Sequence, residues 1–167
     1  MASLYDITIP TFLRGFETLS AILEKGRAYA AEQGWDESEL TGARLIEDMA
    51  PLTAQVQRCS DTAKGVAVRI GEVANVAMPD EEVTLDDLQA RIARTVQFLR
   101  EVPRDCLDAR EDSTVILPTR SGEVSLIARD YATAYALPNF YFHLTTAYAL
   151  LRMKGVPIGK PDYLGRL

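Results

Sequence analysis

Between Leu52 and Val73, apolar residues recur in alternating steps of four and three: Leu52, Val56, Cys59, Ala63, Val66, Ile70 and Val73. This spacing keeps the side chains on one stripe of an α-helix, and a stripe of this length is typical of a helix packed in a bundle. We therefore predict a central helix that begins after Pro51. Because Cys59 belongs to the stripe, we interpret it as a small buried apolar side chain.

The segment before this helix contains two further helical patterns. A first helix is predicted to start at Thr8 or Thr11, beside Pro10, and to run to about Gln33, where Gly34 ends it. Residues Leu40–Met49 are also predicted to be helical, with Pro51 kinking or restarting the chain before the central helix.

Two more helices are predicted in the second half of the chain. Thr84 and Asp87 form a capping-box pattern at the start of one helix, which Pro103 stops. The last helix is expected to run from about Ala128 to Lys154, with Pro138 kinking or dividing it. An irregular tail, residues 156–167, follows.

A short β-hairpin is predicted before the last helix. Two β-prone runs, residues 115–117 and 124–127, flank a turn-like Pro118–Gly122 segment. The predicted fold is therefore all-α, a four-helix bundle with a β-hairpin between helices three and four. Its 167 residues suit a single domain, residues 1–167.

Composition excludes several classes of function. The net charge of −6 argues against a nucleic-acid or anionic-membrane partner, and no apolar run is long enough to span a bilayer. The N-terminus lacks the pattern of a signal peptide, and two cysteines without metal-ligand spacing suit a reducing interior, so we expect a cytoplasmic protein. We find no nucleophile elbow, glycine-rich phosphate loop or zinc-type cluster.

His143 is the only histidine and lies in an otherwise apolar stretch, LPNFYFHLTTAYALLR. In a helix, Asn139, His143 and Thr146 fall along one strip because residues three and four apart share a face. The strip either lines an internal pocket or faces a partner subunit. A lone histidine on an apolar helix is also found as a hydrogen-bonded core residue.

Two polar residues near the central helix are predicted to face inward. Helical geometry places Asp48 and Gln55 within about 40° and 60° of the centre of the apolar stripe. A buried carboxylate needs a donor, and the candidates are His143, Arg44, Arg14 or Tyr148. We predict that His143 and Asp48 are catalytic, with Asp48 setting the tautomer of the imidazole. Substrate is predicted to contact Asn139, Gln55 and Tyr148.

Three stretches resemble a known family: DMAPLTAQVQRCSDTAKG (Asp48–Gly65), VILPTRSGEVSL (residues 115–126) and ALPNFYFHLTTAYALLRMKGVPIGKPDYLG (Ala136–Gly165). They are similar to an uncharacterised bacterial and fungal domain-of-unknown-function family of the DinB/YfiT-like helical-bundle superfamily. The resemblance covers nearly the whole chain and is most specific in the last of the three stretches. It implies a four-helix bundle that is often dimeric, so we expect a homodimer.

The resemblance also implies a type of chemistry. Many superfamily members hold a divalent metal with three histidines, one from helix two and an H-x-x-x-H pair from helix four. Some use low-molecular-weight thiols as cosubstrates in transferase or isomerase reactions. The pair corresponds here to Asn139 and His143, and the helix-two ligand falls near Gln55 or Gln57. Neutral amides are weak ligands for zinc or nickel, so we expect no cofactor and assign no metal ligand.

Three functions remain open at this stage. The first is a bundle that binds a small organic molecule and acts as a metal-independent isomerase or cyclase, with His143 as acid or base. The second is a hydrolase or transferase of the superfamily type that depends on zinc, nickel or manganese. The third is a non-enzymatic binding or stress protein that acts through a helical dimer face.

Overall fold

The computed structural model describes residues 3–119 and 121–165. This part of the chain is mostly helical with one small antiparallel sheet of two strands, as the sequence predicts. Its elements, in chain order, are α1 (Leu4–Gln33), α2 (Ser38–Thr41), α3 (Leu52–Arg69), α4 (Leu85–Arg100), α5 (Asp105–Asp108), β1 (Thr114–Thr119), β2 (Gly122–Ile127), α6 (Ala128–Asp130), the π-helical segment η1 (Tyr131–Ala136), α7 (Leu137–Met153) and α8 (Lys160–Leu164).

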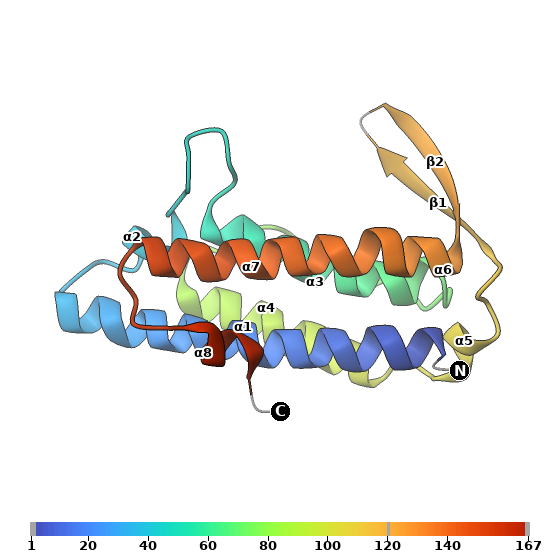
Figure 1. Ribbon diagram of the computed structural model, residues 1–167, viewed down its shortest axis with the longest axis horizontal. Coiled ribbons are helices and arrows are strands. Elements are labelled where there is room, and N and C mark those ends of the chain that lie inside the picture. Colours follow the sequence, from blue (N-terminus) through green and yellow to red (C-terminus); the bar gives the residue numbers. More distant parts are fainter. Residues whose placement is uncertain (1–2, 120, 166–167) are drawn as a thin grey trace.

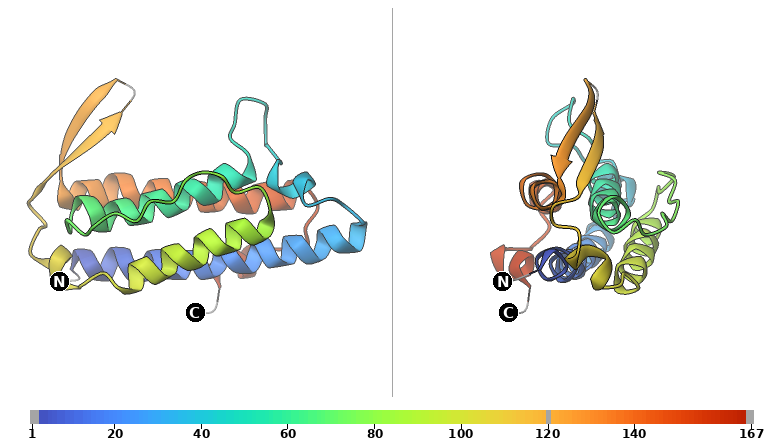
Figure 2. Two further views of the ribbon diagram at one scale, coloured as in Figure 1. Left: turned by 180° about the vertical axis from the view of Figure 1, so that it is seen from behind. Right: turned by 90° about the vertical axis from the view of Figure 1, so that its right-hand side faces the viewer.

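The four long helices α1, α3, α4 and α7 lie side by side around a common core (Figure 1 and Figure 2). Both α1 and α3 pack against α7 and against α4. The apolar stripe predicted for α3 lies in this core, where Val56, Cys59 and Val66 are fully buried. The complete burial of Cys59 confirms its interpretation as a small apolar side chain, and the same burial raises the pKa of its thiol.

The start of α1 differs from the prediction. Ser3 Oγ accepts a hydrogen bond from the Asp6 backbone N–H, and the Asp6 carboxylate accepts one from the Ser3 N–H. This capping box starts the helix at Leu4, so the predicted start beside Pro10 is wrong and Pro10 lies inside the helix. The predicted end is confirmed, because Gly34 adopts a left-handed φ of 67°.

The helix predicted over residues 40–49 is also wrong. The short helix α2 ends at Thr41, and residues 42–51 form an irregular segment, here named the 42–51 loop, that rises away from the helices (Figure 1). Gly42 weakens a helix at this point. The Leu52 backbone N–H donates to the Ala43 carbonyl at 3.0 Å, which ties the two ends of the loop together.

The predicted cap of α4 is confirmed. Thr84 Oγ1 accepts from the Asp87 backbone N–H, and Asp87 accepts from the Thr84 N–H. The helix ends at Arg100, shortly before Pro103.

The hairpin β1–β2 extends beyond the helices (Figure 2). The strands are antiparallel, with Val115 opposite Leu126 and Leu117 opposite Val124, and residue 120 of the predicted turn lies outside the described residues. Val115 and Leu117 are buried, whereas most other strand residues are exposed. The hairpin therefore attaches to the helices through one face of β1.

The last long helical run is continuous from Ala128 to Met153, passing through α6, η1 and α7. Pro138 lies in the first turn of α7, directly after the π-helical segment. The wider π-helical turn directly before Pro138 lets the continuous helix accommodate a residue without a backbone N–H. Pro138 thus marks a change of helix type.

The tail predicted as irregular contains the helix α8, which packs on α1, while residues 166 and 167 lie outside the described part of the chain. Within the described residues, no helix is long and apolar enough to cross a membrane.

Candidate functional site

The candidate site is the junction between α3 and α7, where His143 meets Gln55. Both side chains are buried, and His143 Nδ1 lies 2.8 Å from Gln55 Oε1. Gln55 Nε2 donates to the Ala50 carbonyl, also at 2.8 Å. Because a carbonyl only accepts, the Gln55 amide must turn its oxygen toward the histidine. His143 Nδ1 therefore carries the proton, and the prediction that Gln55 faces inward is confirmed.

The environment of His143 keeps its imidazole neutral. Burial and the nearby positive charge of Arg58 together lower the pKa of His143 to about 4, with burial the larger cause. With the proton on Nδ1, the lone pair is on Nε2, which has no partner among the described residues. Within the described chain, Arg91 Nε is the only fully buried side-chain nitrogen or oxygen that lacks a hydrogen-bond partner. Because Nε2 of His143 is not such an atom, it retains some exposed surface. The lone pair is therefore open to solvent or to a ligand.

A second polar contact lies one turn along the same junction. Asn139 Nδ2 donates to Thr62 Oγ1 at 2.7 Å, so Asn139 and His143 both reach α3 from one strip of α7. The third member of the predicted strip behaves differently. Thr146 Oγ1 donates to the Phe142 carbonyl within its own helix, at 2.7 Å.

Two exposed side chains border the histidine. The ring of Phe142 packs edge-to-face on His143 with centroids 5.2 Å apart, and Phe142 is 57% exposed. Arg58 projects from α3, three residues after Gln55 and four before Thr62. The sequence interpretation missed Arg58 and Thr62, although their spacing from Gln55 places all three on one face of a helix.

The structure does not bring Asp48 to the site. It is exposed in the 42–51 loop, so the prediction that Asp48 faces inward is wrong. The error follows from extending the geometry of α3 backward through Pro51, where the chain is not helical. The partner predicted to fix the imidazole tautomer is replaced by Gln55.

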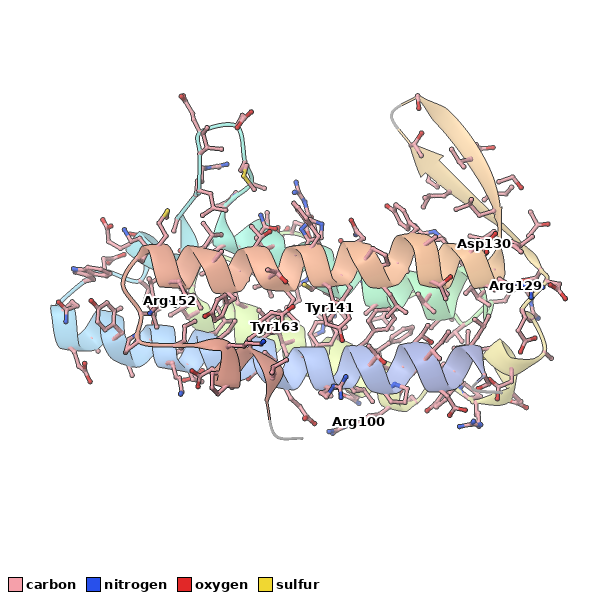
Figure 3. The ribbon with its side chains drawn as sticks, viewed as in Figure 1. Arg100, Arg129, Asp130, Tyr141, Arg152 and Tyr163 are labelled. Atoms are coloured by element: carbon pink, nitrogen blue, oxygen red, sulfur yellow. The ribbon has the colours of Figure 1, made fainter. Side chains whose placement is uncertain are left out.

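Tyr148 is also placed elsewhere. Its ring packs edge-to-face on Tyr163 of α8, and helical geometry puts it about 140° around α7 from His143. Near it, a cavity of about 100 Å³ lies between α1, α7 and α8, with Arg14, Tyr141 and Tyr163 among its lining residues. Figure 3 shows Tyr141 and Tyr163 on this side of α7. The residues predicted to contact substrate therefore lie on two sides of α7: Asn139 faces α3, and Tyr148 faces α8.

The three-histidine metal site of the superfamily does not fit these residues. No three His, Cys, Asp or Glu side chains in residues 3–119 and 121–165 group together as metal ligands would. At the corresponding positions, Asn139 and Gln55 direct amide N–H groups to protein oxygens, and Gln57 Nε2 donates to Glu82 at 2.8 Å. We therefore derive no chemical step through a metal.

The family model of a domain of unknown function, DUF1993, matches residues 4–164. The chain belongs to the DUF1993 family. The resemblance carried by the three sequence stretches is thereby confirmed at the level of an uncharacterised DinB-like family. No curated protein matches the sequence.

Among solved structures, a DinB family member protein from Shewanella denitrificans is similar to this DUF1993 protein. The two are 36% identical, and the match covers 98% of this chain and 93% of that one with a TM-score of 0.91. The likeness establishes a DinB-like fold. It names no reaction or ligand.

Proposed function

We propose that this DUF1993 protein binds a small organic molecule at the junction of α3 and α7, with His143 Nε2 accepting a proton from it. The observation that carries the proposal is the 2.8 Å hydrogen bond between His143 and Gln55. It places a proton on Nδ1, and because the lowered pKa keeps the ring neutral, the lone pair of Nε2 is available. A neutral imidazole in one tautomer is the state in which histidine acts as a base.

The neighbouring residues determine which proton such a base removes. A pKa of about 4 makes His143 a weak base, so the proton must be made acidic by its surroundings. Loss of a proton from carbon beside a carbonyl leaves negative charge on the carbonyl oxygen, and the Arg58 cation stabilises that charge. Asn139 orients the molecule at the other end of the strip. This chemistry is that of an isomerase or cyclase acting without a metal.

The single histidine makes a direct test available. The NMR signal of the His143 ring is followed while a panel of small ketones, keto acids and carboxylic acids is added to the whole protein. We expect a subset of carbonyl compounds to shift this signal. Gln55→Leu should weaken their binding because it frees the imidazole tautomer, whereas Gln57→Leu, two residues along the same helix, serves as the matched control.

Two results would contradict the proposal. One is a panel in which no compound moves the His143 signal. The other is a set of compounds that bind the His143→Gln variant, shown by circular dichroism to be folded, as tightly as the wild type.

A further inference from the structure

The cavity between α1, α7 and α8, here named the α8 cavity, is separate from the His143 site. Tyr141 lines it from α7, and helical geometry puts Tyr141 about 160° around that helix from His143. The volume of the cavity is about 100 Å³. Its lining includes Arg14, Thr18, Tyr141, Leu144, Tyr163 and Leu164.

The α8 cavity presents one positive charge. Arg14 is the only charged residue in its lining, and this exposed side chain forms no ion pair with the described residues. The nearby cation Lys25 is instead bound to Asp162 at 2.5 Å. Glu17 lines only an outer groove between α1 and α8, not the cavity itself. No carboxylate in the lining therefore compensates the guanidinium of Arg14.

The rest of the lining is apolar or already hydrogen-bonded, with one exception. Leu144 is buried, and the hydroxyls of Tyr163 and Thr145 share a hydrogen bond of 2.7 Å. Thr18 Oγ1 donates to the Tyr163 carbonyl at 3.3 Å. The hydroxyl of Tyr141 has no hydrogen-bond partner among the described residues, and its side chain lies on this side of α7 (Figure 3). An apolar space with one free cation and one free hydroxyl fits a small anion with an apolar body.

The helix α8 contributes a wall to this cavity but nothing to the core. None of its side chains is buried. Polar contacts hold it on α1, namely the Lys25–Asp162 ion pair and the hydrogen bond from Thr18 to the Tyr163 carbonyl. The Asp162 carboxylate also accepts from the Gly159 N–H at 2.7 Å, which caps α8. The position of α8 is therefore explained by the space that it encloses with α1 and α7.

We propose that the α8 cavity binds a short-chain aliphatic monocarboxylate. Its carboxylate contacts Arg14 and the Tyr141 hydroxyl, and its alkyl chain lies against Leu144. A cavity of about 150 Å³ holds benzene, so about 100 Å³ suits a chain of about three or four carbons. The outer groove, of about 530 Å³, shares Arg14 and Thr18 with the cavity and gives the ligand a path from solvent.

The first test compares three small molecules of equal carbon number. Butyrate, succinate and n-butylammonium are titrated into the whole protein, and saturation-transfer NMR gives their dissociation constants. Butyrate should bind about tenfold or more tightly than the other two. Succinate would place a second carboxylate in the apolar interior without a partner, and butylammonium would meet the like charge of Arg14. Equal binding of the three, or no binding of butyrate, would overturn the proposal.

The second test assigns the binding to Arg14. Arg14→Met keeps an unbranched side chain but removes the charge, and should weaken butyrate binding by about tenfold. Arg100→Met is the matched control, because Arg100 is an exposed arginine of α4 that lines neither the cavity nor the outer groove. Circular dichroism checks that both variants are folded. Butyrate binding that Arg14→Met leaves unchanged would show that the ligand lies elsewhere.

The proposal is independent of the function proposed for His143, and the experiment keeps the two apart. Butyrate should leave the NMR signal of His143 unmoved and should bind His143→Gln as tightly as the wild type. Binding that is lost in His143→Gln but kept in Arg14→Met would overturn the α8 cavity as the site and place butyrate at the junction of α3 and α7.

Discussion

At the scale of single residues, the tautomer of His143 is fixed by a neighbour that has no charge. Gln55 is held by the Ala50 carbonyl and presents its oxygen to Nδ1, so it fixes the tautomer without raising the basicity of the ring. A carboxylate at this position, as predicted with Asp48, would have raised the pKa of the histidine. The amide thus allows a buried, neutral imidazole beside the Arg58 cation.

The lowered pKa of His143 predicts a defined dependence of stability on pH. In the unfolded chain the histidine has a pKa near 6.5 and is protonated below that pH. In the folded protein His143 is protonated only below about pH 4. Stability should therefore fall as pH decreases through this window, by up to about 3 kcal/mol. Denaturant unfolding of the wild type and of His143→Gln, compared at each pH, isolates the effect. Identical pH profiles would show that the ring is not desolvated as described.

Zinc binding supplies a second prediction at this scale. A metal ion that binds only the folded state raises the melting temperature. This site offers zinc one imidazole and two amides that already bond to protein oxygens, so its affinity for zinc should be low. A molar excess of zinc should leave the melting temperature of the untagged protein unchanged. A rise that is seen in the wild type and absent in His143→Gln would show that a metal site exists.

At the scale of elements, α7 is positioned by its close contact with α1. A Cβ atom built on Gly15 would lie 2.4 Å from Phe140 Cε1, whereas one on Gly26 would lie 3.0 Å from the end of the flexible Leu151 side chain. Gly15→Ala should therefore destabilise the fold by about 1–3 kcal/mol, and Gly26→Ala clearly less. Thermal unfolding of both variants checks this. Equal effects would mean that Phe140 can move aside.

The elements also show what the sequence could and could not predict. Strong signals, such as the stripe of α3 and the Thr84 cap of α4, led to the correct elements because local geometry alone determines them. The predicted start of α1 is wrong because Pro10 also suits the interior of this helix, while the Ser3–Asp6 capping box, which the sequence contains, sets the actual start. The helix predicted over residues 40–49 is wrong because Gly42 weakens a helix there and the hydrogen bond from Leu52 to Ala43 closes the segment as a loop.

The sequence predicts only part of the candidate site, because it indicates which residues share a helix face but not how the helices pack together. His143, Asn139 and Gln55 lie on regular helices, so their spacing predicts which face they occupy. Asp48 lies outside a helix, and Arg58 was missed although it shares the face of Gln55. Which side chains meet across α3 and α7 depends on the packing of the two helices. A single sequence does not specify that.

At the scale of the whole molecule, the homodimer expected from the family resemblance would make thermal stability depend on protein concentration. If folded chains associate and unfolded chains do not, a hundredfold increase in protein concentration should raise the melting temperature by about 3–5 °C. Scanning calorimetry over that range of protein concentration tests this. A wild-type melting temperature that is independent of concentration would show that folded chains do not associate over this range.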